Sequence, residues 1–151
     1  MGVREALAAA GHALPEPAAP VGAYLPAVRS GSLVFTSGQI PMREGALLAS
    51  GVVGADVGEH AARECAVQCT LNALAAASTV CSLDDVVRVV KVVGYVASAP
   101  GYTAQPRVID ATSEMLVAAF GDKGRHAREA VGVTGLPIGA PVEISLVLEI
   151  R

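Results

Sequence analysis

The stretch DVVRVVKVVGYVAS, at residues 85–98, restricts the fold more than any other feature of the sequence. Side chains alternate between the two faces of a β-strand, and valine occupies both faces here. The predicted faces are Val86, Val90 and Val92 on one side, and Val87, Val89 and Val93 on the other. A strand that is apolar on both faces is typical of a sheet covered on both sides. We therefore expect a central strand, with helices over one face and a neighbouring subunit over the other.

The composition also favours burial between subunits. Hydrophobic residues make up 52% of the 151 residues and charged residues only 17%, and the mean hydropathy is +0.51. No apolar run is long enough to span a bilayer, so this excess does not indicate a transmembrane helix. A homo-oligomer that buries apolar surface between its copies explains the composition more simply.

Charge and cysteine content narrow the class of function and the expected compartment. The formal net charge is -3, no cluster of Lys and Arg occurs, and aromatic residues make up 3%. These values argue against nucleic-acid binding, which relies on cationic contacts to phosphate and on aromatic stacking. Cys65, Cys69 and Cys81 are odd in number, and no signal-peptide pattern precedes them. We therefore expect free thiols in a reducing cytoplasm.

The order of patterns predicts one α+β domain. Residues 1–20 are expected to be an N-terminal extension, a short Ala-rich helix and a Pro/Ala linker, and residues 21–151 a single domain. The expected elements are strands at 23–28 and 32–40, a short strand within 45–54, a long helix from Asp56, the strand at 85–98, a helix at 101–121, and strands at 126–134 and 141–150. Asp56 and Glu59 have the spacing of a capping box.

The long helix carries small residues at helical spacing, which would let it lie close to a sheet. They are Ala62, Cys65, Ala66, Cys69, Ala73 and Ala76. The two cysteines one turn apart, with His60 nearby, resemble part of a metal site, but zinc normally takes three or four ligands. Core cysteines are therefore the favoured interpretation, and no metal is expected. Nucleotide-binding loops and the G-x-S-x-G nucleophile motif are absent from the sequence.

Two charges interrupt the last two strands. Glu143 lies on the more polar face of an alternating strand, a pattern that by itself favours a solvated glutamate. Arg128 shares its face with residues that become small or uncharged beyond it. That pattern suits a pocket for a ligand carboxylate, because guanidinium and carboxylate pair bidentately. A surface arginine fits the same pattern about equally well.

The spacing of the two charges bears on whether they share a site. A simple hairpin between 126–134 and 141–150 would place Glu143 opposite Val133. Arg128 would then lie roughly 16 Å further along, at about 3.3 Å per residue. The two charges could share a site only if these strands are not simple partners or if the site lies between subunits.

The segment TSGQIP supplies further polar candidates. Ser37 offers a hydroxyl group at a strand end, and Gly38 would let a ligand approach the backbone closely. A turn that ends the strand explains the same residues.

The chain resembles the RidA/YjgF family from about Ala18 to Arg151. The segments that carry the resemblance, in the family's order, are VGAYLPAV, LVFTSGQIP, LNALAAA, AREAVGV and LPIGAPVEI. The SGQIP turn and the Arg-x-x-V, LP and VEI block are the most specific of them. The resemblance implies a chorismate-mutase-like α+β fold, with a mixed sheet packed against two helices. It also implies a homotrimer with a barrel-like core and clefts between adjacent subunits.

The resemblance implies an activity and its residues. It implies hydrolysis of 2-imino and enamine acids such as 2-aminoacrylate to 2-keto acids and ammonia, without a metal or organic cofactor. An enzyme of this kind is a 2-iminobutanoate/2-iminopropanoate deaminase. The family's carboxylate-binding arginine matches Arg128, and its water-positioning glutamate matches Glu143. Its pocket tyrosine matches Tyr24, and its serine-glycine turn matches Ser37 and Gly38.

Two residues depart from the family's pattern and keep other functions open. Ala130 stands where the family often has cysteine, and it would touch a ligand through its backbone. Asp110 stands at a family asparagine and would bring negative charge towards an anionic substrate. These departures favour a first alternative, a non-catalytic trimer that binds small carboxylate metabolites. A ribonuclease or translation inhibitor is a second alternative, and the acidic composition disfavours it.

Overall fold

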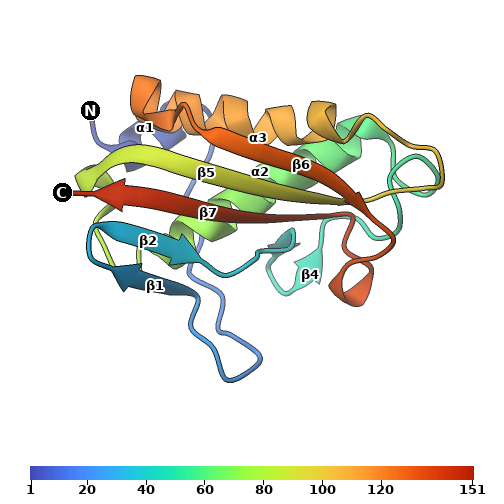
Figure 1. The fold of residues 1–151 in the computed structure, drawn as a ribbon, viewed down its shortest axis with the longest axis horizontal. Helices are drawn as coiled ribbons and strands as arrows, with labels where there is room; N and C mark the ends of the chain where they lie inside the picture. Colours follow the sequence, from blue (N-terminus) through green and yellow to red (C-terminus); the bar gives the residue numbers. More distant parts are fainter.

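The computed structural model describes residues 1–151 and has a mixed sheet with its helices on one face (Figure 1). The helices are α1 (Val3–Ala9), α2 (Glu59–Ala77) and α3 (Gln105–Phe120), with short 3-10 turns at Leu83–Asp85, Gly121–Gly124 and Pro137–Gly139. The strands are β1 (Ala27–Ser30), β2 (Leu33–Thr36), β3 (Met42–Arg43), β4 (Ala46–Leu47), β5 (Val86–Ala97), β6 (Ala127–Val133) and β7 (Val142–Ile150). This architecture confirms the predicted α+β class.

The order of strands in the main sheet is β1-β2-β7-β5-β6. Only the β5–β6 pair is parallel, and the other neighbours are antiparallel. β5 therefore lies between two neighbours, which confirms the predicted central strand. It also separates β6 from β7, so the strands that carry Arg128 and Glu143 are not hairpin partners.

The core lies between the sheet and the two long helices. The small-residue stripe of α2 is buried, as predicted, and so are Val108, Thr112, Met115 and Ala119 of α3. A Cβ atom at Gly94 of β5 would lie 2.6 Å from Cδ1 of Ile109, so glycine lets α3 lie directly on the strand. Each fully buried aliphatic side chain in such a core contributes about 1.5–3 kcal/mol relative to exposure.

The predicted division of valines along β5 was partly wrong. Val86, Val89 and Val92 are buried, whereas Val90 is only partly buried. The register with β7 shifts between Val86 and Arg88 and again between Val89 and Lys91. A β-bulge adds a residue and resets the two-residue alternation, which explains why Val89 faces the helices.

The predicted start of the long helix was also wrong. α2 begins at Glu59, after Gly58 in an extended conformation at the N-cap. Oδ2 of Asp56 instead accepts a hydrogen bond from the Val52 backbone N–H at 3.1 Å. The carboxylate therefore stabilises the turn before the helix, a role that competes with capping in Asp-containing sequences. The strand expected within 45–54 is confined to Ala46–Leu47, which pairs with β3.

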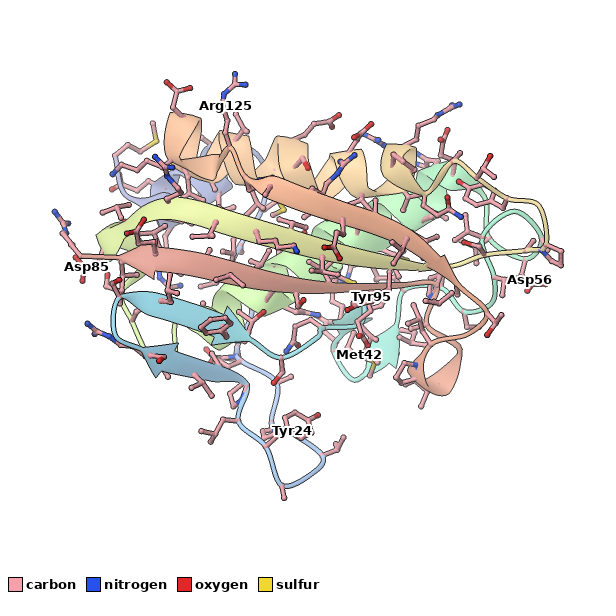
Figure 2. The ribbon with its side chains drawn as sticks, in the orientation of Figure 1. Tyr24, Met42, Asp56, Asp85, Tyr95 and Arg125 are labelled. Carbon is pink, nitrogen blue, oxygen red and sulfur yellow. The ribbon has the colours of Figure 1, made fainter.

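The second face of the sheet has no helix over it (Figure 1). Exposed apolar side chains on the strands include Val28, Phe35, Val87 and Val131. Figure 2 shows this face, with Tyr95 labelled near the C-terminal end of β5. On the helix side, α1 packs against α3 and buries Val3 and Leu7. No helix in the structure combines the length and apolar character needed to cross a membrane.

Candidate functional site

Glu143 lies near the start of β7 on the face of the sheet away from the helices. Its neighbours along the strand, Val142 and Ile144, are fully buried on the helix side, and its cross-strand partner is Tyr95. Burial raises the pKa of the Glu143 carboxyl above its ordinary value of 4.5, and no opposite charge offsets this rise. The carboxylate is therefore poised to accept a proton more readily than a solvated glutamate.

The Ser37–Gly38 turn lies against this carboxylate. A Cβ atom at Gly38 would lie 2.6 Å from Oε2 of Glu143, so glycine leaves room for the carboxylate in its observed position. The neighbouring Gln39 exchanges two backbone hydrogen bonds with Ile144 of β7, at 2.8 and 3.0 Å. These bonds fix the turn beside β7, so the turn does more than end β2.

Ser37 holds the loop that carries Tyr24. Its hydroxyl group donates to the Leu25 carbonyl at 2.6 Å, and its N–H donates to the Pro26 carbonyl at 2.9 Å. Tyr24 lies on the loop before β1 and is 52% exposed (Figure 2). Because the hydroxyl proton of Ser37 is used on the backbone, this group is left as a hydrogen-bond acceptor for a ligand.

An open cavity of about 1310 Å³ lies beside this turn. The N-terminal segment from Gly11 to Val21 forms much of its wall. Tyr24 and Gly38 line it, together with polar side chains that include Gln39, Gln68 and Asn72. Two of the predicted ligand-binding residues therefore share one cavity, next to Glu143.

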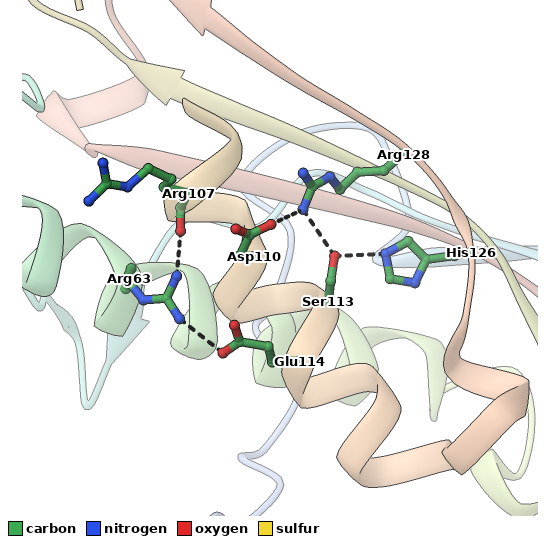
Figure 3. Close-up of polar contacts among 7 residues, drawn as sticks. All are labelled: Arg63, Arg107, Asp110, Ser113, Glu114, His126 and Arg128. Carbon is green, nitrogen blue, oxygen red and sulfur yellow. Dashed lines mark hydrogen bonds and ion pairs between the residues drawn. The ribbon is translucent and has the colours of Figure 1, made fainter. Parts of the chain in front are cut away.

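Arg128 lies on the opposite side of the sheet, over α3 (Figure 3). Its Nη1 donates to Oδ1 of Asp110 at 2.8 Å and to Oγ of Ser113 at 3.2 Å. The side chain of Arg128 is 25% exposed and that of Asp110 is 45% exposed. Arg128 is thus neither a free surface arginine nor an unpaired charge in a pocket.

The contacts of Arg128 continue into a directed network. Nδ1 of His126 is 2.6 Å from the Gly124 carbonyl, which only accepts hydrogen bonds, so this nitrogen carries a proton. In neutral His126, Nε2 then accepts from the Ser113 hydroxyl at 2.9 Å. Ser113 in turn accepts from Arg128, so each group fixes the orientation of the next.

One chain does not bring Arg128 and Glu143 together. Arg128 pairs with Val92, which pairs with Leu146, and both of these partners are buried under the helices. Glu143 is three residues from Leu146 on the same strand, an odd number, so it points to the other face. Ala130 is two residues from Arg128 and therefore lies on its side of the sheet.

The sequence did not lead us to Ser113 or to the ion pair of Asp110 with Arg128. Asp110 and Ser113 are three residues apart on α3 and so lie on one helix face, a spacing visible in the sequence. The sequence does not show how α3 packs over β6, and this packing is what brings that helix face to Arg128. His126 is two residues before Arg128, so strand alternation puts it on the same face, and the contact of both residues with Ser113 agrees with this.

The cysteines of α2 lie in the core. Cys65 and Cys69 are buried, and burial is the main cause that raises the pKa of the Cys65 thiol to about 11. The His60 side chain is 91% exposed and pairs with Glu64 at 3.3 Å. No group of three or more potential metal ligands comes together in the structure.

The chain is similar to known proteins over nearly its whole length. Residues 4–150 match the family described as "YjgF/chorismate_mutase-like, putative endoribonuclease". The protein TCP17 of Trypanosoma cruzi is 40% identical over 143 residues, which are 91% of this chain and 88% of that protein.

Solved structures show the same fold. A protein of unknown function from Agrobacterium tumefaciens, Atu1372, is 38% identical with a TM-score of 0.90, covering 99% of this chain and 92% of that one. A putative endoribonuclease from Shewanella oneidensis is 31% identical with a TM-score of 0.95, covering 99% of this chain and 100% of that one. The match of sequence and the match of fold agree, and this chain belongs to the YjgF/RidA family.

Proposed function

We propose that this chain is a homotrimeric hydrolase that converts reactive 2-imino and enamine acids to 2-keto acids and ammonia. Arg128 of one subunit would bind the substrate carboxylate, and Glu143 of a neighbouring subunit would orient the attacking water and accept its proton. The observation that carries the proposal is the partly buried Glu143, whose pKa is raised by burial and by nothing else. A base tuned towards neutral pH suits proton transfer from water at physiological pH.

The two faces of the sheet support a site between subunits. Arg128 and Glu143 point to opposite faces, so one chain cannot present both to a small ligand. A second copy seated on the uncovered face would bury Phe35 and Val131, which are 43% and 41% exposed. Burial of such side chains is the usual source of association free energy between copies.

The chemistry requires little beyond positioning and one base. An imine carbon is electrophilic, more so when its nitrogen is protonated, so water needs only orientation and proton removal. A fixed carboxylate contact holds the substrate in the geometry for attack, and positioning of this kind supplies a large part of many rate enhancements. Gly38 leaves room for the Glu143 carboxylate beside the turn.

A non-catalytic binding module is the second candidate. The observation that favours it is the fixed position of Arg128, which Asp110 and Ser113 hold by hydrogen bonds, because a pre-oriented guanidinium supports ligand binding without any chemical step. Tyr24 and Gly38 would contribute to the same ligand cavity in either case. Imine turnover separates the two candidates.

RNA cleavage, suggested by the description of the Shewanella relative, has less support. The chain has 11 Lys and Arg residues, and its net charge is -3. Six of these cationic side chains form ion pairs with carboxylates: Arg63, Lys91, Arg107, Arg125, Arg128 and Arg151. Affinity for RNA depends on cations free to contact phosphate, which this surface offers sparsely.

An imine-hydrolysis assay tests the proposal. An amino-acid oxidase generates the imine in the presence of semicarbazide, which traps any imine that the protein does not hydrolyse. We expect wild-type protein to lower the yield of semicarbazone, and Arg128→Ala to lose this effect while keeping the oligomer. Absence of turnover with several imines, together with binding of small keto acids, would select the binding module.

Mixed oligomers test whether the site is shared between subunits. Arg128→Ala and Glu143→Gln chains are each expected to be inactive alone. Co-expressed in one trimer, they would restore the clefts that combine an intact Arg128 with an intact Glu143, about a quarter of all clefts at equal mixing. A mixture that stays inactive, although hybrid trimers form, would contradict the shared site.

A further inference from the structure

The ion pair of Arg128 and Asp110 presents two opposite charges to the solvent side by side (Figure 3). Both hydrogen bonds from Arg128 leave from Nη1, so Nη2 and Nε remain for a ligand. Asp110 uses Oδ1 for the pair, so Oδ2 remains as an acceptor. Arg128 and Asp110 are 25% and 45% exposed, which leaves both within reach of a small molecule.

This arrangement is poorly suited to a ligand that carries only a carboxylate. Such a ligand gains from the guanidinium but is repelled by Asp110, whose carboxylate oxygen is only 2.8 Å from Arg128 Nη1. At similar distances, the attraction and the repulsion largely cancel. A ligand with a positively charged nitrogen next to its carboxylate meets an opposite charge at both ends.

We propose that Asp110 is a specificity-determining residue. Together with Arg128 it would select ligands in which a carboxylate adjoins a cationic nitrogen, as in a protonated 2-imino acid, over 2-keto acids. This inference rests on the proposed function, for which the protonated imine is the substrate and the keto acid is the product. Asp110 acts on the choice of ligand, whereas Glu143 acts on water.

The reaction removes the charge that Asp110 recognises. Hydrolysis breaks the C=N bond of the iminium carboxylate and forms a C=O bond with the oxygen of water. The nitrogen leaves as ammonium with the positive charge, and the keto acid keeps the carboxylate. Asp110 then faces an anion without a cationic partner, which weakens the binding of product relative to substrate.

The alternative role for Asp110 is purely structural, as an anchor for the Arg128 side chain. Glu114 offers a matched control, because it lies on the same helix and pairs with Arg63 at 2.9 Å, away from Arg128 (Figure 3). Asp110→Asn and Glu114→Gln each remove one negative charge and one ion pair from α3 with almost no change in side-chain volume. Only the first removes charge beside Arg128.

Calorimetry with L-alanine and pyruvate tests the inference without turnover. The two probes share a three-carbon skeleton and a carboxylate, and only alanine has a cationic nitrogen. We expect the wild type to bind alanine more tightly than pyruvate, and Asp110→Asn to shift the ratio of the two affinities towards pyruvate by about tenfold or more. Glu114→Gln should keep the wild-type ratio. A wild type that prefers pyruvate or binds neither probe, an unchanged ratio in Asp110→Asn, or an equal shift in Glu114→Gln would overturn the inference.

The imine assay separates this inference from the function on which it rests. In an active protein, Asp110→Asn should raise KM for the imine and strengthen inhibition by pyruvate, whereas kcat should change less. Turnover by the wild type with no such shift would remove the role of Asp110 and leave the hydrolase. Absence of turnover, with the alanine preference intact and lost in Asp110→Asn, would remove the hydrolase and leave a charge-pair binding site.

Discussion

Arg128 and Glu143 lie on strands that flank β5, and the surroundings of their charges differ. Arg128 is paired with Asp110 and continues through Ser113 to His126, so its charge is compensated and its orientation is fixed. Glu143 is partly buried against the Ser37–Gly38 turn, and its pKa is raised because burial disfavours its charge. On one face of the sheet the polar groups are therefore hydrogen-bonded to one another. On the other face a carboxylate is partly buried, which disfavours its ionised form.

The difference agrees with the roles proposed above, binding for Arg128 and proton transfer for Glu143. A guanidinium held in place by fixed hydrogen-bond partners suits recognition of a charged ligand. A carboxylate that resists ionisation destabilises the folded chain, and such groups are concentrated at functional sites. Substitutions on each face of the sheet test the two roles separately.

The largest expected effect is on turnover in Glu143→Gln. Glutamine keeps the size of the side chain but cannot accept the proton of water, so imine hydrolysis should fall by about 10²–10⁴-fold. The measurement is the initial rate of imine loss in the semicarbazide assay. Glu149→Gln is the control, because Glu149 lies on the same face of β7 near its other end. Wild-type activity in Glu143→Gln would contradict a role of Glu143 in proton transfer.

Much of the fold was predictable because its patterns are local. The alternation of Val142, Ile144 and Leu146 in the sequence indicates the buried face of β7, and Pro106 and Gly121 lie at the two ends of α3, where proline and glycine are common. The faces of β5 were predicted wrongly at Val89 because a bulge depends on pairing with β7, which leaves no mark in the sequence of β5 itself.

The site was predictable residue by residue but not as an arrangement. Resemblance pointed to Arg128 and Glu143, and the glycine beside Glu143 was already a candidate for close approach. The opposite faces of these two charges follow from the insertion of β5 between their strands, a long-range pairing. The partner of Arg128 depends on how α3 packs over β6, so Asp110 was recognised as a charge but not as the ion-pair partner.

A smaller effect on turnover is expected in Gly38→Ala. The added methyl group would lie 2.6 Å from Oε2 of Glu143 and must push the carboxylate aside. A displacement of this size should lower the rate of imine hydrolysis by about 10–100-fold. Stability should change little, because the displaced atoms are the end of a flexible side chain. Gly135→Ala, in open space, is the control, and equal rates in the two variants would argue against a poised Glu143.

On the Arg128 side, Ser113→Ala should have a modest effect on stability. It removes the hydroxyl group that joins Arg128 to His126, and the free energy of unfolding should fall by about 1 kcal/mol. The loss is limited because Arg128 is 25% exposed, so water can replace the missing partner. Urea unfolding of Ser113→Ala, His126→Ala and the double variant measures the coupling between the two residues. A loss of several kcal/mol would show that the network is a stabilising core instead of a solvent-facing recognition surface.

The smallest expected effect is the pH dependence that Glu143 adds to stability. Because its folded-state pKa is raised above 4.5, the folded protein binds the proton more tightly than the unfolded chain does. This contribution favours the folded state fully at low pH and is lost as pH rises from about the unfolded-state pKa to the raised value. The free energy of unfolding of wild type should therefore fall relative to Glu143→Gln across that window, measured by urea titration at a series of pH values. The carboxylate keeps partial contact with water, so the change should be smaller than that in Ser113→Ala. A wild type that instead gains stability over Glu143→Gln as pH rises would mean that the carboxylate has a stabilising partner, and the contrast with Arg128 would disappear.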